Sequence, residues 1–79
     1  MSKQEYLQLK KELRNKCKTN VKEICHNAGL DDYEKALIDE LYMKTKKINT
    51  CVRLGIGETK YTNDLKQALN KINDYLKRH

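Results

Sequence analysis

Residues 54–61 of this chain, Leu-Gly-Ile-Gly-Glu-Thr-Lys-Tyr, constrain its fold more than any other stretch. A short segment with apolar residues at helical spacing precedes them, and a longer one follows. Glycine readily adopts the backbone conformation found at helix ends, so Gly55 predicts the end of the first segment. The second is expected to begin at Gly57 or Glu58. The pattern therefore predicts a short helix, a tight turn and a long helix that continues to about residue 77.

The spacing of apolar residues predicts which face of each helix is buried. In the long helix this face comprises Tyr61, Leu65, Ala68, Leu69, Ile72 and Leu76, and in the short one Ile48, Cys51, Val52 and Leu54. A first helix is predicted over residues 4–25, with a stripe of Tyr6, Leu9, Leu13, Cys17, Val21, Ile24 and Cys25. Gly29, which follows it, is a candidate C-terminal cap.

A further helix is predicted to open at Asp31, whose carboxylate can cap it while Glu34 reaches back, as in a capping box. Its expected buried face consists of Tyr33, Leu37 and Leu41, with Ile38 and Tyr42 beside them. Thr45, in the polar stretch that follows, is a candidate cap for the short helix.

The chain has 79 residues and no proline, which suits one small helical core and leaves no room for a second. We expect a single all-α domain over residues 1–79, a small helical bundle that contains a helix-turn-helix in residues 30–79 and an additional N-terminal helix in residues 1–29. No apolar run reaches membrane-spanning length, and no secretory signal is visible. These features predict a cytoplasmic protein whose three cysteines are free thiols.

The formal net charge of +6 is unevenly distributed. Residues 1–29 carry seven Lys and Arg against three acids, and residues 44–79 carry nine against three. Residues 30–43 carry five acids against one lysine. This distribution suits one face against a polyanion and another against a basic protein surface. Ordinary solvated helix surface is the alternative interpretation of the same charges.

Residues 30–78 resemble region 4 of bacterial sigma factors and the related C-terminal halves of phage late-transcription regulators. The resemblance rests on Ile38-Asp39-Glu40-Leu41-Tyr42 at the end of one helix, on the Leu54-Gly55-Ile56 turn, and on Ala68-Leu69 at the family's spacing from that turn. The chain departs from the family at Gly57, where serine is usual, and at Thr50, where an apolar residue is usual. Nothing before residue 30 resembles the promoter-opening part of a sigma factor, so we do not expect a complete one.

The resemblance implies a sequence-specific DNA-binding transcriptional regulator from a phage or other mobile element, with double-stranded DNA as its partner. The outward residues of the long helix would then meet base edges: Lys60 donates to guanine, Asn63 donates to adenine, and Glu58 accepts from cytosine or only offsets the helix dipole. Residues flanking the turn would meet backbone phosphates. The predicted DNA-binding set is Lys46, Lys47, Arg53, Glu58, Thr59, Lys60, Thr62, Asn63 and Lys66.

Other functions remain open on the same residues. The domain is alternatively a small protein-interaction module or inhibitor whose acidic helix, residues 31–40, binds a host protein such as RNA polymerase. A protein that packages DNA without sequence preference is a third class. The N-terminal helix either completes the core or presents its apolar stripe as the seam of a homodimer.

We expect neither a metal site nor a catalytic site in this sequence. The three cysteines lack the paired spacing of structural zinc sites, and Cys17, Cys25 and Cys51 fall on apolar stripes, where cysteine behaves as a small hydrophobe. His26 adjoins Cys25 in sequence but would point to another side of the helix. No carboxylate pair, phosphate loop or serine-centred motif is present, so we predict no metal, no cofactor and no enzymatic activity.

Overall fold

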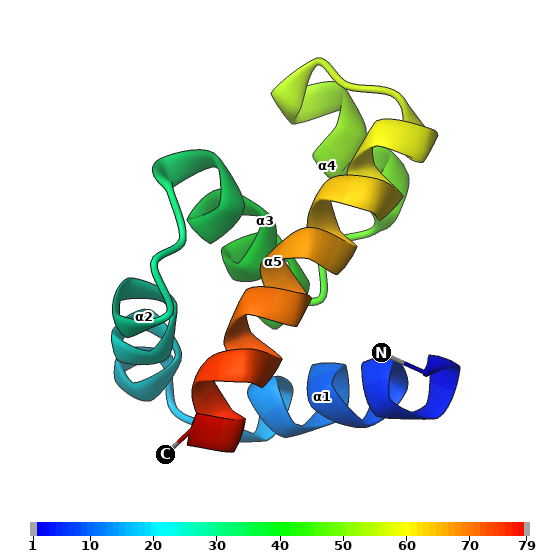
Figure 1. Ribbon diagram of the computed structural model, residues 1–79. Helices are drawn as coiled ribbons and strands as arrows, with labels where there is room; N and C mark the ends of the chain where they lie inside the picture. The colour runs from blue at the N-terminus through cyan, green and yellow to red at the C-terminus, as the bar shows by residue number, and fades with distance from the viewer. Residues whose placement is uncertain (1, 79) are drawn as a thin grey trace.

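The computed structural model describes residues 2–78, which form helices joined by short loops, with no strand among them. The five helices are α1 (Lys3–Asn15), α2 (Lys18–Asn27), α3 (Asp32–Tyr42), α4 (Lys47–Leu54) and α5 (Glu58–Arg78). Figure 1 shows α5 crossing the molecule, with α1 and α2 near its C-terminal half and α4 beside its N-terminal end. Because α5 contacts each of the other four helices, it organises the core.

The predicted single helix over residues 4–25 is wrong, because the chain breaks into α1 and α2. Lys16 and Cys17 adopt extended backbone conformations between them. The hydroxyl of Tyr42, at the end of α3, donates to the carbonyl of Lys16 at 2.9 Å. The two short helices can therefore pack on different sides of α5, and this tertiary arrangement outweighs the continuous helical pattern. Cys17, predicted to be buried, is exposed at the break.

The start of α3 confirms the predicted capping box. The backbone N–H of Glu34 donates to Asp31 Oδ1 at 2.7 Å, and the backbone N–H of Asp31 donates to Glu34 Oε1 at 3.3 Å. Gly29 has the left-handed conformation expected of a helix C-terminal cap, with φ of 81°. These two features fix where α2 ends and where α3 begins.

The core forms where the predicted apolar faces of α1, α2, α3 and α5 meet. Its buried members are Leu9, Leu13, Val21, Cys25, Leu30, Leu37, Ile38, Leu41, Cys51, Tyr61, Leu65, Ala68, Leu69 and Ile72. The stripe predicted for the long helix is confirmed, with Leu76 partly buried at its end. Since Leu9 and Leu13 are buried within the chain, the N-terminal stripe completes the core.

The face predicted to be buried in α4 is partly wrong. Ile48 and Val52 are 61% and 77% exposed, whereas Thr50 is fully buried beside Cys51. The Thr50 hydroxyl donates to the carbonyl of Lys46 at 3.4 Å, which satisfies it within the helix. Thr45 is not the cap either, because Lys46 precedes α4 and makes no side-chain cap hydrogen bond. The helix is rotated from its hydropathy pattern, and two aliphatic side chains face outward.

None of the helices in residues 2–78 combines the length and the apolar character needed to span a bilayer.

Candidate nucleic-acid interface

The turn between α4 and α5 is closed by backbone hydrogen bonds. Gly55, with φ of 67°, lets the N–H of Ile56 donate to the carbonyl of Cys51 at 3.0 Å, while its own N–H donates to the carbonyl of Val52 at 3.3 Å. This is the pairing of a Schellman motif, and it requires the left-handed conformation that glycine adopts easily. The turn thus fixes where α5 begins, at Glu58.

The side of α5 opposite its buried stripe is polar and exposed. Thr59 and Asn63, both in the predicted set, lie on it and are exposed. Gln67 and Asn70, which the predicted set omits, follow one and two turns later and are also exposed. Extending the helical spacing of Thr59 and Asn63 by two turns would have found them. We call these four residues the outer face of α5.

Lys60 lies beside this outer face and is held toward α3. Its Nζ is 2.9 Å from Asp64 Oδ2 and 5.6 Å from the ring centroid of Tyr33. The Tyr33 hydroxyl donates to the same carboxylate oxygen at 2.7 Å. Burial and this hydrogen bond raise the pKa of Tyr33 to about 12, and the hydrogen bonds from Lys60 and Tyr33 lower the pKa of Asp64. Asp64 therefore joins α5 to α3, and the charge of Lys60 is balanced within the chain.

Five of the predicted residues gather in one shallow hollow of about 270 Å³. Its lining residues are Lys47, Glu58, Thr59, Thr62 and Asn63. Lys47 reaches it from the first turn of α4, and its Nζ lies 5.8 Å from the ring centroid of Tyr61. The hollow contains hydrogen-bond donors and acceptors together with one ammonium group, which suits the polar edges and phosphates of a nucleic acid.

The other predicted residues lie apart from this hollow. Arg53 forms an ion pair with Glu40, a residue of α3 that is only 7% exposed. Glu40 Oε2 is buried with no hydrogen-bond partner in residues 2–78, so Arg53 supplies the carboxylate's neutralising charge. Lys46 is exposed directly before α4. Lys66 is exposed on α5 and borders a second hollow, against α1.

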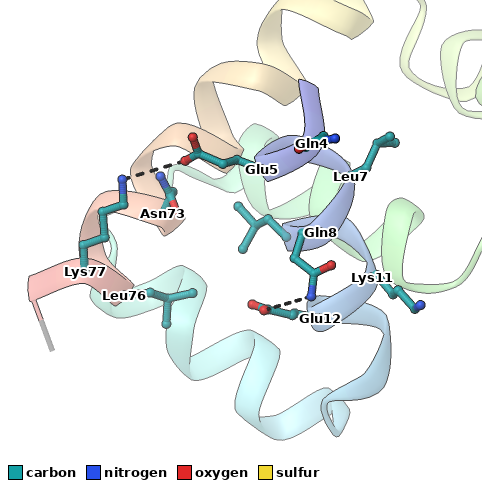
Figure 2. Close-up of a pocket in the computed structure, with 10 residues that line it drawn as sticks. Gln4, Glu5, Leu7, Gln8, Lys11, Glu12, Asn73, Leu76 and Lys77 are labelled. Atoms are coloured by element: carbon teal, nitrogen blue, oxygen red, sulfur yellow. Dashed lines mark hydrogen bonds and ion pairs between the residues drawn. The ribbon is translucent and has the colours of Figure 1, made fainter. Parts of the chain in front are cut away.

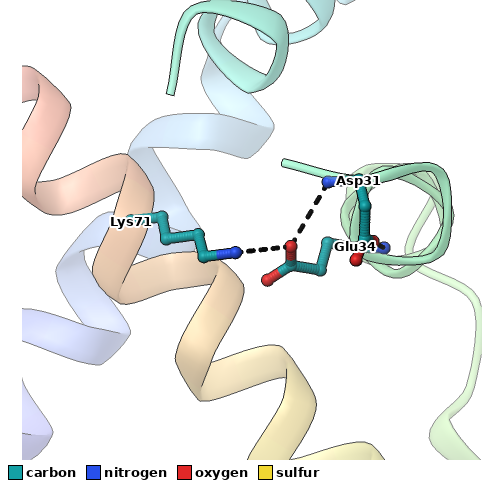
Figure 3. Close-up of polar contacts among 3 residues, drawn as sticks. All are labelled: Asp31, Glu34 and Lys71. Carbon is teal, nitrogen blue, oxygen red and sulfur yellow. Dashed lines mark hydrogen bonds and ion pairs between the residues drawn. The ribbon is translucent and has the colours of Figure 1, made fainter. Parts of the chain in front are cut away.

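Two of the five acidic residues in the predicted partner-binding helix are turned inward. Glu34 is 6% exposed, and its Oε1 accepts from Lys71 Nζ of α5 at 2.7 Å (Figure 3). Glu40 is paired with Arg53 in the same way. The acidic surface of α3 is therefore smaller than its sequence suggests, and it includes the exposed Asp31 and Asp32.

An open groove of about 700 Å³ lies between α1 and the C-terminal end of α5. Figure 2 shows Leu7 and Leu76 among its lining residues, and Glu5 beside Lys77 across it. The Lys77 ammonium is 3.9 Å from Glu5 Oε2, and both side chains are largely exposed. None of the predicted DNA-binding residues lines this groove.

Two of the three cysteines are placed for packing. Cys25 and Cys51 are buried, and burial raises the pKa of Cys25 to about 11, which keeps it a neutral thiol. Within the described chain, no three His, Cys, Asp or Glu side chains come together as a metal-binding group.

Comparison with known proteins gives no relative: no protein-family model matches the chain, and neither a curated protein nor a solved structure is similar enough to count as a match.

Proposed function

We propose that this protein is a sequence-specific DNA-binding transcription regulator, in which α4 and α5 form a helix-turn-helix like that of sigma factor region 4, as carried by phages and mobile elements. The observation that carries the proposal is the outer face of α5, which is polar, exposed and directly follows the glycine turn. A helix presented in this way fits the major groove of B-DNA.

In this proposal the N-terminal half of α5 contacts base edges. The side-chain amide of Asn63 can donate one hydrogen bond to adenine N7 and accept another from adenine N6. Gln67, one turn later on α5, carries the same amide group. Thr59 and Thr62 contact a phosphate or a thymine methyl. Lys46 and Lys47, at the start of α4, contact phosphates and set the register.

Two of the predicted contacts carry a cost. Lys60 must leave Asp64 to reach guanine, and Arg53 must leave the buried Glu40 to reach a phosphate. The Asp64 pair lies at an exposed flank and exchanges easily with solvent. The Glu40 carboxylate is buried although Arg53 itself is exposed, so removing Arg53 leaves a buried charge unpaired; we therefore assign Arg53 to folding and Lys46 and Lys47 to the phosphates.

Selection from a random duplex library, followed by titration of the enriched site, tests sequence-specific binding. We expect an enriched sequence, and we expect Asn63→Ala to lose about 1–3 kcal/mol of discrimination at one base pair. Asn20→Ala, an equivalent change at an exposed position of α2, is the matched control and keeps full discrimination. Binding with no enriched sequence contradicts specific regulation and favours the packaging role.

One observation favours the second candidate, a protein-interaction module. Ile48 and Val52 are one turn apart on α4 and expose 61% and 77% of their surface, as apolar contacts to a protein partner do. Binding of purified RNA polymerase by the wild-type protein, and its loss in Ile48→Gln/Val52→Gln, would support this function. DNA binding that survives the same double change keeps the first proposal intact.

A further inference from the structure

One face of α1 carries a tyrosine and two cations. Tyr6, Lys10 and Arg14 occupy successive positions four residues apart, so their side chains are neighbours on the helix surface. Lys10 is partly buried, and its Nζ lies 5.0 Å from the ring centroid of Tyr6. Arg14 Nε donates to the carbonyl of Leu41 at 3.4 Å, near the end of α3. The two charges are therefore positioned by contacts within the fold.

A third cation, Lys47, lies at the start of α4. Lys47 lies over the ring of Tyr61, and its charge acts on Lys10. Burial first, and then the positive charges of Arg14 and Lys47, lower the pKa of Lys10. Tyr61 likewise contributes to the raised pKa of Tyr6, after burial. We call Lys10, Arg14 and Lys47 the basic cluster; it rests on the rings of Tyr6 and Tyr61.

The basic cluster has no acid of its own. The ion pairs found among residues 2–78 use Arg53, Lys60, Lys71 and Lys77. Like charges held near one another repel, and partial burial adds to the cost of keeping Lys10 ionised, whereas Arg14 and Lys47 are exposed. Folding gains little from such an arrangement, whereas a bound anion would offset the repulsion. Arrangements that are unfavourable for folding, such as neighbouring like charges, are expected at functional sites.

The basic cluster also lies along one edge of the outer face of α5. Lys47 lines the hollow that contains Thr59 and Asn63. Tyr6 lines the second hollow, of about 430 Å³, together with Lys66 and Asn70. A cation of the cluster therefore lines one hollow beside α5, and the ring under Lys10 lines the other.

We propose that the basic cluster binds a backbone phosphate of the same DNA duplex whose major groove receives α5, which makes α1 a DNA-contacting helix. The inference rests on the proposed function. Ammonium and guanidinium groups are the donors that phosphate prefers, and the Tyr6 and Tyr61 rings hold two of them in place. The phosphate contact fixes the angle at which α5 enters the groove, because α1 and α5 pack against each other.

The salt dependence of binding tests the cluster. Lys10→Gln removes the ammonium group of the cluster that the proposed function does not already place on a phosphate, while Arg14 is kept because it also contacts α3. Lys11→Gln makes the same change in net charge at an exposed position outside the cluster. Circular dichroism establishes that both variants fold. Each is then titrated with a labelled duplex of random sequence at several salt concentrations.

We expect the Lys10 variant to bind more weakly and its slope of log K against log salt to fall in magnitude by about 1, because one ammonium group no longer neutralises phosphate charge. The control variant should differ from the wild type in slope by less than half of that change. Equal slopes in the two variants overturn the inference and leave the proposed function standing. A wild-type protein that binds no duplex at low salt overturns the proposed function and the inference together.

Discussion

Lys44 is the non-glycine residue of the described chain that has a positive φ, 59°. The N–H of Thr45 donates to the carbonyl of Glu40 at 3.0 Å, and the N–H of Lys44 donates to the carbonyl of Leu41 at 3.1 Å. These are the same hydrogen bonds that end α2 at Gly29 and α4 at Gly55. The helices α2, α3 and α4 therefore end with the same hydrogen bonds. At the end of α3 the left-handed position is occupied by Lys44, where glycine would be unstrained.

Replacing this lysine with glycine should stabilise the protein. We expect Lys44→Gly to raise the free energy of unfolding by up to about 1 kcal/mol, because relief of left-handed strain exceeds the extra entropy of glycine in the unfolded chain. Lys44→Ala removes the same charge but keeps a Cβ, and it should give no gain. Urea unfolding measures both variants; an equal gain in the two would assign the effect to charge instead.

Arg53 is a second residue whose role follows from one partner. Arg53→Met leaves the buried carboxylate of Glu40 without its cation, so we expect a loss of about 1–3 kcal/mol in the free energy of unfolding. Lys46→Met makes the same change in charge at an exposed site and should cost less than about 0.5 kcal/mol. If Arg53→Met kept full stability and weakened DNA binding, the sequence-based assignment of Arg53 to phosphate would be correct.

The packing of α3 on α5 depends on polar groups as well as on the core. Tyr33 with Asp64, and Glu34 with Lys71, join the two helices at their flank. The pKa of Tyr33 is about 12 in the folded protein, above its ordinary value of 10.0. The unfolded chain therefore releases this proton at lower pH than the folded chain does, and stability present below pH 10 is lost as pH rises toward 12.

Tyr33→Phe should change this alkaline behaviour. Because phenylalanine does not titrate, we expect the variant's free energy of unfolding to decline less steeply than that of the wild type between about pH 10 and 12. Some decline remains, since the pKa values of Tyr6 and Tyr61 are also raised by burial. Tyr75→Phe, a tyrosine at the far end of α5, serves as the comparison. Identical pH profiles for wild type and Tyr33→Phe would contradict the assignment.

For single helices, the sequence correctly predicts the features that depend on residues close together in the chain. The capping box at Asp31 and the buried stripe of α5 depend on spacing within one helix, and both are confirmed. The break at Lys16 has no proline or glycine to mark it, because it depends on Tyr42, 26 residues away. The orientation of α4 was equally hidden, since hydropathy favours burying Ile48 over Thr50.

In the candidate interface, too, some features follow from helical spacing and others depend on how the helices pack. Helical spacing correctly placed Thr59 and Asn63 on an exposed side of α5. It did not reveal that Tyr33 joins Asp64, or that Arg53 pairs with Glu40, because those partners are set by which helices meet. The Lys60–Asp64 pair lies within α5, four residues apart, and helical spacing could have found it. The proposed role of α1 could not be found from spacing: Lys10 and Lys47 are far apart in the chain, and the charge of Lys47 acts on Lys10 only in the fold.

Over the whole molecule, the positive charge is partly balanced by the way the helices pack. Glu34, Glu40 and Asp64 each neutralise a cation on the α3 side of α5 or on α4. The basic cluster and Lys66 remain without an acidic partner in residues 2–78, on the other side of the outer face of α5. These four cations lie on α1, α4 and α5, beside the outer face of α5, where positive charge favours the approach of a polyanion.

The central claim, that this surface binds duplex DNA, is tested most directly by fluorescence anisotropy of a labelled random-sequence duplex titrated with the wild-type protein. We predict binding that weakens steeply between about 50 and 200 mM salt, with log K linear in log salt, because phosphate contacts release counterions. Absence of binding at the lowest salt, or binding that does not respond to salt, would contradict the account and direct attention to the exposed Ile48 and Val52 as a protein-binding surface.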